Sequence, residues 1–194
     1  CSSWTEGDNL GTARGEAAGY GTQTAGNFIG GGTPSGVDQY ETYDGTSWSE
    51  SPYDLNTART MNAGCGTQTA GLTFGGLATT TRNETEEFSG SGWAEQANLS
   101  TARYMSVGCG TQTAALCIGG QDPGEHFKNT EEYDGSSWTA GGTPLANQTG
   151  SGSSGTQTAA LAAGGSPSLT TSATYDGSSW ATAPVIATGR GSLA

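Results

Sequence analysis

A repeat of about 45 residues constrains the fold of this chain more than any other feature of its sequence. Tryptophan recurs at intervals of 44, 45, 45 and 42 residues, at Trp4, Trp48, Trp93, Trp138 and Trp180. The tetrapeptide Gly-Thr-Gln-Thr recurs in the same phase, starting at Gly21, Gly66, Gly110 and Gly155. Because these independent motifs share one period, they predict stacked copies of a single structural unit.

Further marks keep this phase. A double glycine follows each tetrapeptide, at 30–31, 75–76, 119–120 and 164–165. Tyr-Asp-Gly comes next in three copies, and the second copy reads Phe88-Ser89-Gly90 instead. Thr-Ala-Arg ends at Arg14, Arg59 and Arg103, whereas the fourth copy has Gln148 and Arg190 begins a fifth.

The third copy shows how each unit divides into four short strands. The strands are expected at 103–109, 114–118, 129–133 and 136–139. Met105, Val107 and Cys109 fall on one face at period two, as in a strand with one buried side. The Asp134-Gly135 pair favours a tight turn between strands three and four, because both residues tolerate positive φ. The connection between strands two and three is longer and differs in every copy.

These units predict an all-β fold, a β-propeller of four-stranded antiparallel blades in a single domain spanning 1–194. The complete blades are expected at about 14–48, 59–93, 103–138 and 148–180. Residues 1–13 and 181–194 are expected to contribute to a closing or partial blade. Three arrangements remain open: further blades on a longer chain, a compact ring with a makeshift last blade, or open ends that pair with another chain.

The order of these marks resembles the kelch repeat: double glycine, Tyr-Asp, tryptophan about five residues on, then arginine. The segments Gly-Thr-Gln-Thr-Ala and Tyr-Asp-Gly-Ser-Ser-Trp also resemble degenerate kelch-like repeats of marine bacteriophage virion proteins. The resemblance covers essentially the whole chain. It implies a kelch-like propeller and, for the phage proteins, a structural or attachment role in a virion or outside cells.

The charge balance excludes some function classes. The formal net charge is −12, and Lys128 is the only lysine. Binding to nucleic acid needs clustered Lys and Arg to neutralise phosphates, so no nucleic-acid partner is expected. No apolar run approaches the ~20 residues that span a membrane, so no membrane insertion is expected.

The cysteines do not indicate a disulfide or a zinc site. Cys65 and Cys109 hold the same repeat position on neighbouring blades. Packed sheets lie about 10 Å apart, whereas a disulfide needs Cβ atoms about 3.8 Å apart. Cys117 is offset from Cys109 across a hairpin, and Cys1 replaces a repeat glycine. We expect small buried residues rather than a bonded pair.

Two repeated columns are interpreted as structural. The first comprises Arg14, Arg59 and Arg103, which we expect to bond carbonyls or the acids Glu41, Glu86 and Glu131 and so tie blade to blade. The second comprises Trp48, Trp93, Trp138 and Trp180, which we expect to pack between blades. The alternatives are an arginine ring that binds an anion and tryptophan platforms that stack on sugars.

Recognition is expected where the copies differ, in the loops after the double glycines. The candidate ligand-binding residues in these loops are Arg82, Asp122, Glu125, His126 and Lys128. Asp122, Glu125 and His126 are also types that ligate metals or transfer protons. A single histidine without a repeated acid does not make such a site, so no catalytic residue, metal or cofactor is predicted.

The predicted function is a non-enzymatic structural and recognition module, such as a virion appendage that mediates attachment or protein contact. Its partners would be other structural subunits or a cell-surface receptor or glycan, within a larger oligomeric assembly. One alternative is a secreted lectin-like propeller with glycan sites between blades. Another is an intracellular kelch-type protein-interaction domain.

Overall fold

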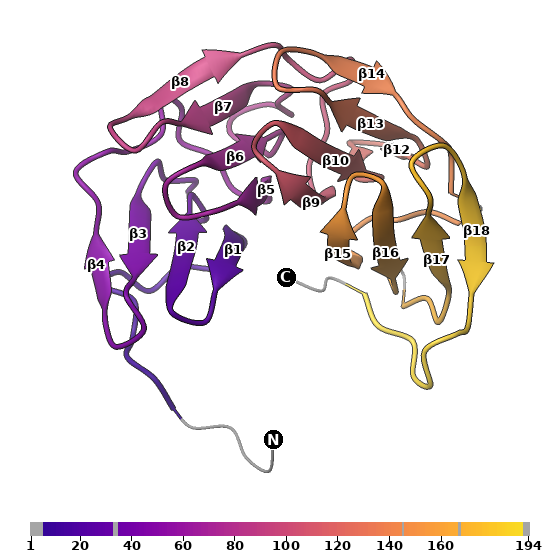
Figure 1. Cartoon of the computed structure of the whole chain (residues 1–194), viewed down its shortest axis with the longest axis horizontal. Helices are drawn as coiled ribbons and strands as arrows, with labels where there is room; N and C mark the ends of the chain where they lie inside the picture. The colour runs from indigo at the N-terminus through magenta and orange to yellow at the C-terminus, as the bar shows by residue number, and fades with distance from the viewer. Residues whose placement is uncertain (1–5, 33–34, 145, 167, 192–194) are drawn as a thin grey trace.

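A computed structural model describes residues 6–32, 35–144, 146–166 and 168–191. Within these ranges every regular element is a strand, and the strands form four antiparallel sheets of four with one additional short hairpin (Figure 1). The sheets are the blades of a four-bladed β-propeller, which confirms the predicted fold class. No helix in the described ranges is long and apolar enough to span a membrane.

Each blade uses its strands in the order in which the chain makes them. The first blade comprises β1 (Ala18–Thr22), β2 (Ala25–Ile29), β3 (Tyr40–Tyr43) and β4 (Trp48–Glu50). The second comprises β5 (Ala63–Gly66), β6 (Gly71–Phe74), β7 (Thr85–Phe88) and β8 (Trp93–Gln96).

The two later blades repeat this plan. The third comprises β9 (Val107–Thr111), β10 (Ala114–Ile118), β13 (Thr130–Tyr133) and β14 (Trp138–Ala140). The fourth comprises β15 (Gly152–Thr156), β16 (Ala159–Ala163), β17 (Ser172–Tyr175) and β18 (Trp180–Ala183). The hairpin of β11 (Gln121–Asp122) and β12 (Glu125–His126) lies in the third blade's loop and was not predicted.

The blades form an arc with their first strands innermost and their fourth strands outermost (Figure 1). β1 contacts β5, β5 contacts β9, and β9 contacts β15 around the axis. Small residues dominate these strands, which suits their crowded position near the axis. The arc is open between the first and fourth blades, so each of these has one face that no described blade covers.

The core lies between blades rather than within them. Three buried clusters occupy the three blade junctions, and each combines side chains of two consecutive blades. Trp138 stacks edge-on against Phe74 of the preceding blade, with ring centroids 4.8 Å apart, and its indole N–H donates to Thr85 at 2.9 Å. Trp180 makes the same bond to Thr130 at 3.0 Å. Packing against the preceding blade is thus confirmed for Trp93, Trp138 and Trp180. The aromatic contacts of Trp48 are with Phe28 and Tyr43 of its own blade instead.

The first strands begin later than predicted, because one residue before each of them adopts a left-handed backbone. These residues are Glu16, Met61, Met105 and Gly150, with φ between 53° and 59°. Their backbone groups form a series of hydrogen bonds around the axis. The Met61 amide donates to the Glu16 carbonyl, the Met105 amide to the Met61 carbonyl and the Gly150 amide to the Met105 carbonyl, at 2.6, 3.0 and 2.8 Å. These bonds link the starts of the four blades.

Candidate functional site

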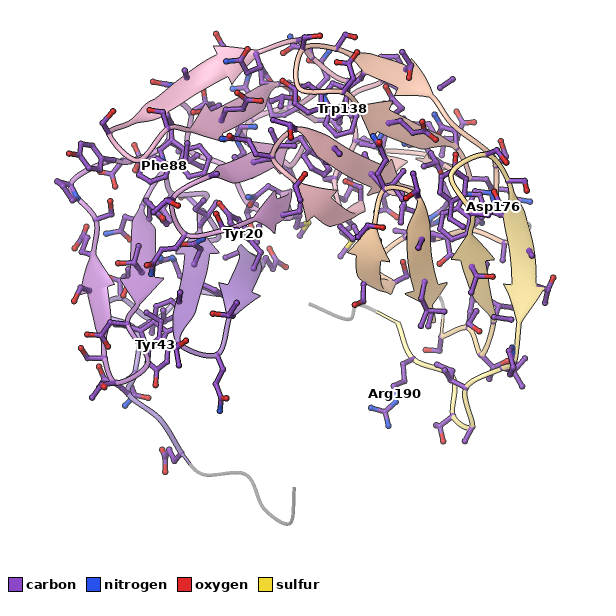
Figure 2. The ribbon with its side chains drawn as sticks, viewed as in Figure 1. Tyr20, Tyr43, Phe88, Trp138, Asp176 and Arg190 are labelled. Carbon is purple, nitrogen blue, oxygen red and sulfur yellow. The ribbon has the colours of Figure 1, made fainter. Side chains whose placement is uncertain are left out.

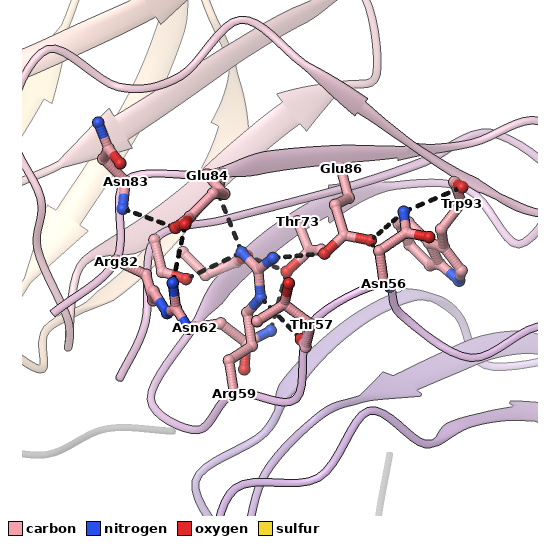
Figure 3. Close-up of polar contacts among 12 residues, drawn as sticks. Asn56, Thr57, Arg59, Asn62, Thr73, Arg82, Asn83, Glu84, Glu86 and Trp93 are labelled. Atoms are coloured by element: carbon pink, nitrogen blue, oxygen red, sulfur yellow. Dashed lines mark hydrogen bonds and ion pairs between the residues drawn. The ribbon is translucent and has the colours of Figure 1, made fainter. Parts of the chain in front are cut away.

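The repeated arginines support the loops that follow the double glycines. The Arg59 guanidinium pairs with Glu86 and donates to the carbonyls of Gly75 and Glu84 at 3.2 and 3.0 Å (Figure 3). The other carboxylate oxygen of Glu86 accepts from the backbone and side-chain amides of Asn56 at 2.8 and 2.9 Å. Both charged side chains are fully buried. Burial lowers the pKa of Arg59, and the charge of Glu86 opposes this shift.

Equivalent networks lie in the first and third blades. Arg103 donates to Glu131 at 2.7 Å and to the Gly119 carbonyl at 2.9 Å, and Arg14 pairs with Glu41. The prediction that arginine bonds carbonyls and these acids is confirmed. The expectation that these side chains tie blade to blade is wrong, because each arginine and its acid belong to the same blade.

The backbone of the same arginines makes the link between blades. The Arg59 carbonyl accepts from Gly31 of the first blade at 3.0 Å, and the Arg103 carbonyl accepts from Gly76 of the second at 2.8 Å. Gly31 and Gly76 both have φ near 100°, at 91° and 105°, a conformation that favours glycine. Arg59 and Arg103 therefore each fix the preceding loop through their backbone and their own loop through their side chain.

The fourth blade replaces both members of the ion pair. Gln148 takes the place of the arginine, and Ala173 takes the place of the glutamate at its position in β17. Gln148 is 1% exposed, and its side-chain oxygen has no hydrogen-bond partner among the described residues. Loss of both charges avoids an unpaired buried charge, which costs more than an absent pair. The repeat shows the change at Gln148, whereas the change at Ala173 was not predicted.

The glutamine of Gly-Thr-Gln-Thr links adjacent blades, a role that was not predicted. Its side-chain amide donates to two carbonyls of the preceding blade, one on strand two and one at the end of strand three. Gln112 reaches the carbonyls of Gly71 and Phe88 at 3.0 and 2.7 Å, and Gln157 reaches those of Ala115 and Tyr133 at 3.2 and 2.7 Å. Its invariance across the four copies was the available signal.

The loops after the double glycines occupy equivalent places on one rim. Each loop pairs with the entry segment of its own blade, by which we mean the residues just before its first strand. In the first three blades the bridges are Gly15–Gly32, Thr60–Leu77 and Tyr104–Gln121. Their interiors differ, however. The first two loops close on single bridges, between Gly32 and Gly36 and between Leu77 and Thr81, whereas the third forms the β11–β12 hairpin.

Four of the five candidate ligand-binding residues lie together on this third loop. Asp122 pairs with Glu125 across the hairpin, and His126 and Lys128 follow. Glu125, His126 and Lys128 are exposed. The His126 Nδ1 lies 3.0 Å from the Thr149 hydroxyl, which itself donates to the Gly120 carbonyl at 2.9 Å. The hairpin is therefore held at both its base and its histidine.

Arg82 lies apart from these four residues, on the loop of the second blade. It pairs with Glu84 at 3.0 Å, and the two side chains are 27% and 19% exposed (Figure 3). No group of three or more His, Cys, Asp or Glu side chains in the described ranges is arranged to hold a metal ion.

The described cysteines are free thiols, as expected. Cys65, Cys109 and Cys117 are buried, and Cys1 lies outside the described residues. Burial raises the pKa of Cys109 and of Cys117 to about 11, and that of Cys65 further. These thiols are packing groups and are poor nucleophiles at neutral pH.

A pocket of about 390 Å³ lies beside the axis, between the starts of the first strands. The left-handed residues Glu16, Met61, Met105 and Gly150 line it with small residues of the strands that follow. The rest of its lining is glycine, alanine and valine, together with the polar residues Asn62, Ser106, Ser151 and Ser153.

No family model matches the chain, and no curated protein matches it either.

Proposed function

We propose that this chain is a non-enzymatic kelch-like recognition module that binds a macromolecular partner through the loops of one rim. The observation that carries the proposal is a contrast within each blade. The arginine, glutamine and tryptophan that recur are used in packing, whereas the loops they support differ in sequence and conformation. Variable loops on a rigid scaffold are where binding specificity usually resides.

The hairpin of the third blade is the strongest contact element on this rim. Its exposed Glu125, His126 and Lys128 present both signs of charge in a chain that is otherwise acidic. The contact between His126 and Thr149 holds the hairpin against the entry segment of the fourth blade. A surface that is fixed before binding loses less conformational entropy on association.

The resemblance to kelch-like proteins of marine bacteriophages supports a virion appendage outside cells, with structural subunits or a cell-surface receptor or glycan as partner. The arrangement of the tryptophans disfavours the alternative in which tryptophan rings between blades stack on sugars. Trp138 and Trp180 use their rings and indole N–H groups against the preceding blade, which leaves them poorly placed as sugar platforms. A glycan partner would be bound by the rim loops.

The test measures binding of the fluorescently labelled chain to whole bacterial cells of a strain panel by flow cytometry. A variant carrying Glu125→Ala, His126→Ala and Lys128→Ala is expected to lose binding to any strain that the parent chain binds. Glu95→Ala, an exposed acid on the outer strand of a different blade, is the matched control and should bind normally. Equal binding by the triple variant would overturn the assignment to the third hairpin.

A further inference from the structure

The fourth blade presents a face that the other blades keep covered. Leu72 and Leu116 hold one position in the second strands of their blades, and both are fully buried by the blade that follows. Leu161 holds that position in β16 and is 43% exposed. We use "the open face" for Leu161, Ala163 and Thr174 together with the carbonyls of Ala160 and Tyr175.

Arg190 lies at the rim of this face in the place of a blade-opening arginine. Its amide donates to the Leu169 carbonyl at 3.1 Å and its carbonyl accepts from Gly165 at 2.8 Å. Arg59 makes the same two backbone bonds to Val37 and Gly31. The side chains differ completely, because that of Arg59 is buried on Glu86 whereas Arg190 is exposed and points into the gap of the arc (Figure 2).

The carbonyls of the open face lack the donor that their counterparts have. Gly71 and Phe88 accept from Gln112, and the corresponding pair Ala115 and Tyr133 accepts from Gln157. No described side chain donates to the carbonyls of Ala160 and Tyr175, which hold these positions in the fourth blade. The missing group is therefore a glutamine from a turn like Gly-Thr-Gln-Thr.

A second pairing rule specifies the aromatic residue that fits. Tyr133 donates to Glu87 of the preceding blade at 2.9 Å, and Tyr175 bonds Glu132 in the same way. Phe88, which has no hydroxyl, follows a blade with Thr42 at the acid's position. Thr174 holds this position on the open face, so a phenylalanine in the manner of Phe88 is the matching residue.

We propose that the open face is the docking surface for a fifth blade of this same repeat, joined to the fourth through Arg190. That blade supplies a glutamine to the Ala160 and Tyr175 carbonyls, a glutamate to Arg190 and a phenylalanine over Thr174. A second copy of the chain is a poorer occupant. In a second copy docked as the next blade, the Arg14 carbonyl would have to accept from the Gly165 amide. That amide already donates to the Arg190 carbonyl.

This inference does not depend on the proposed recognition function. The test lengthens the chain by one blade, with residues 60–103 copied in place of those after Arg190. The copied blade already fits a preceding blade that carries Thr42, and it brings Gln68, Glu86 and Phe88. The reporter is Leu161→Cys, whose labelling by a maleimide measures exposure of the open face in both chain lengths.

Labelling at Leu161→Cys is expected to slow by about tenfold or more in the lengthened chain, as burial limits access to local opening. The control carries Gln68→Ala and Glu86→Gln within the copy and should regain most of the labelling rate. An unchanged rate in the lengthened chain would overturn the proposal, whether or not the copied blade folds. Slow labelling of the 194-residue chain with a dimeric native mass would assign the face to a second copy instead.

Discussion

Gln68 of the second blade donates its side-chain amide to the Tyr43 carbonyl of the first blade at 3.0 Å. The same amide donates to the Gly26 carbonyl at 3.2 Å. One side chain thus joins two strands of the neighbouring blade at once. Because the bond recurs at Gln112 and Gln157, the glutamines connect the four blades in series.

Replacement of this glutamine should weaken the propeller only where a preceding blade is present. Gln112→Ala leaves two carbonyls without their donor, so we expect a loss of about 1–3 kcal/mol in the free energy of unfolding. Gln23 holds the same position in the first blade, is exposed and makes no described side-chain hydrogen bond. Gln23→Ala should therefore change stability by less than about 0.5 kcal/mol. Urea unfolding compares the two, and equal losses would contradict the linking role.

Removal of one member of a buried ion pair should cost more than removal of both. Arg103→Gln leaves Glu131 charged and 1% exposed, so we expect a loss of about 3–5 kcal/mol. Arg103→Gln with Glu131→Ala copies the residues of the fourth blade and should recover part of that loss. A double-mutant cycle by chemical denaturation measures the coupling between the two sites. Strictly additive effects would show that the pair is not coupled.

The outer turns should make stability depend on acid. A hydrogen bond from the Ser136 hydroxyl, with the amides of Ser137 and Ser136, lowers the pKa of Asp134 to about 2. Bonds from the Ser179 amide and the Ser178 hydroxyl lower the pKa of Asp176 to about 2. Because the folded values lie below the ordinary value of 3.8, this stabilisation is present above pH 3.8 and lost as the pH falls towards 2.

Asp134→Asn with Asp176→Asn removes these two titrations. We expect thermal melts of the double variant to show a smaller decrease in midpoint between pH 4 and 2 than those of the parent chain. Any remaining decrease reports the other carboxylates. A pH dependence identical to that of the parent would show that these turns do not contribute.

The buried thiols should react only when the propeller opens. Burial raises the pKa of Cys109 and of Cys117 to about 11, which leaves little thiolate at neutral pH. Iodoacetamide at pH 8 should leave Cys65, Cys109 and Cys117 unmodified in the native chain and modify all three in urea. Peptide mass mapping identifies the modified sites. Fast native reaction at Cys109 would contradict its packing between blades.

The sequence predicted the features whose signals are local. Alternation along 107–109 and the Asp134-Gly135 pair indicate a strand and a turn within a few residues, and the period then places the blades. The left-handed Met61 and Met105 escaped prediction because non-glycine residues rarely adopt positive φ, and nothing in their side chains indicates it. The role of Gln112 was hidden because its partners lie 41 and 24 residues away, on another blade.

Only part of the candidate site could be predicted from the sequence. Departure from the repeat identified the loop that holds Asp122, Glu125, His126 and Lys128, since a variable segment stands out against recurring positions. The hairpin itself was missed, because β11 and β12 have only two residues each and too little length for alternation. The pairing of Arg82 with Glu84 depends on side-chain geometry that periodicity does not describe.

The fourth blade allows the ion pair to be restored rather than removed. Gln148→Arg alone should destabilise the chain, because it places a charge in a site that is 1% exposed and that has Ala173 at the position of the acid. Gln148→Arg with Ala173→Glu supplies the acid at the position that Glu131 holds in the third blade, and should recover most of the loss. Gln148→Met, similar in size and uncharged, is the control for packing. Urea unfolding of the four chains separates these effects, and a double variant no more stable than Gln148→Arg would show that the fourth blade has lost the site as well as the pair.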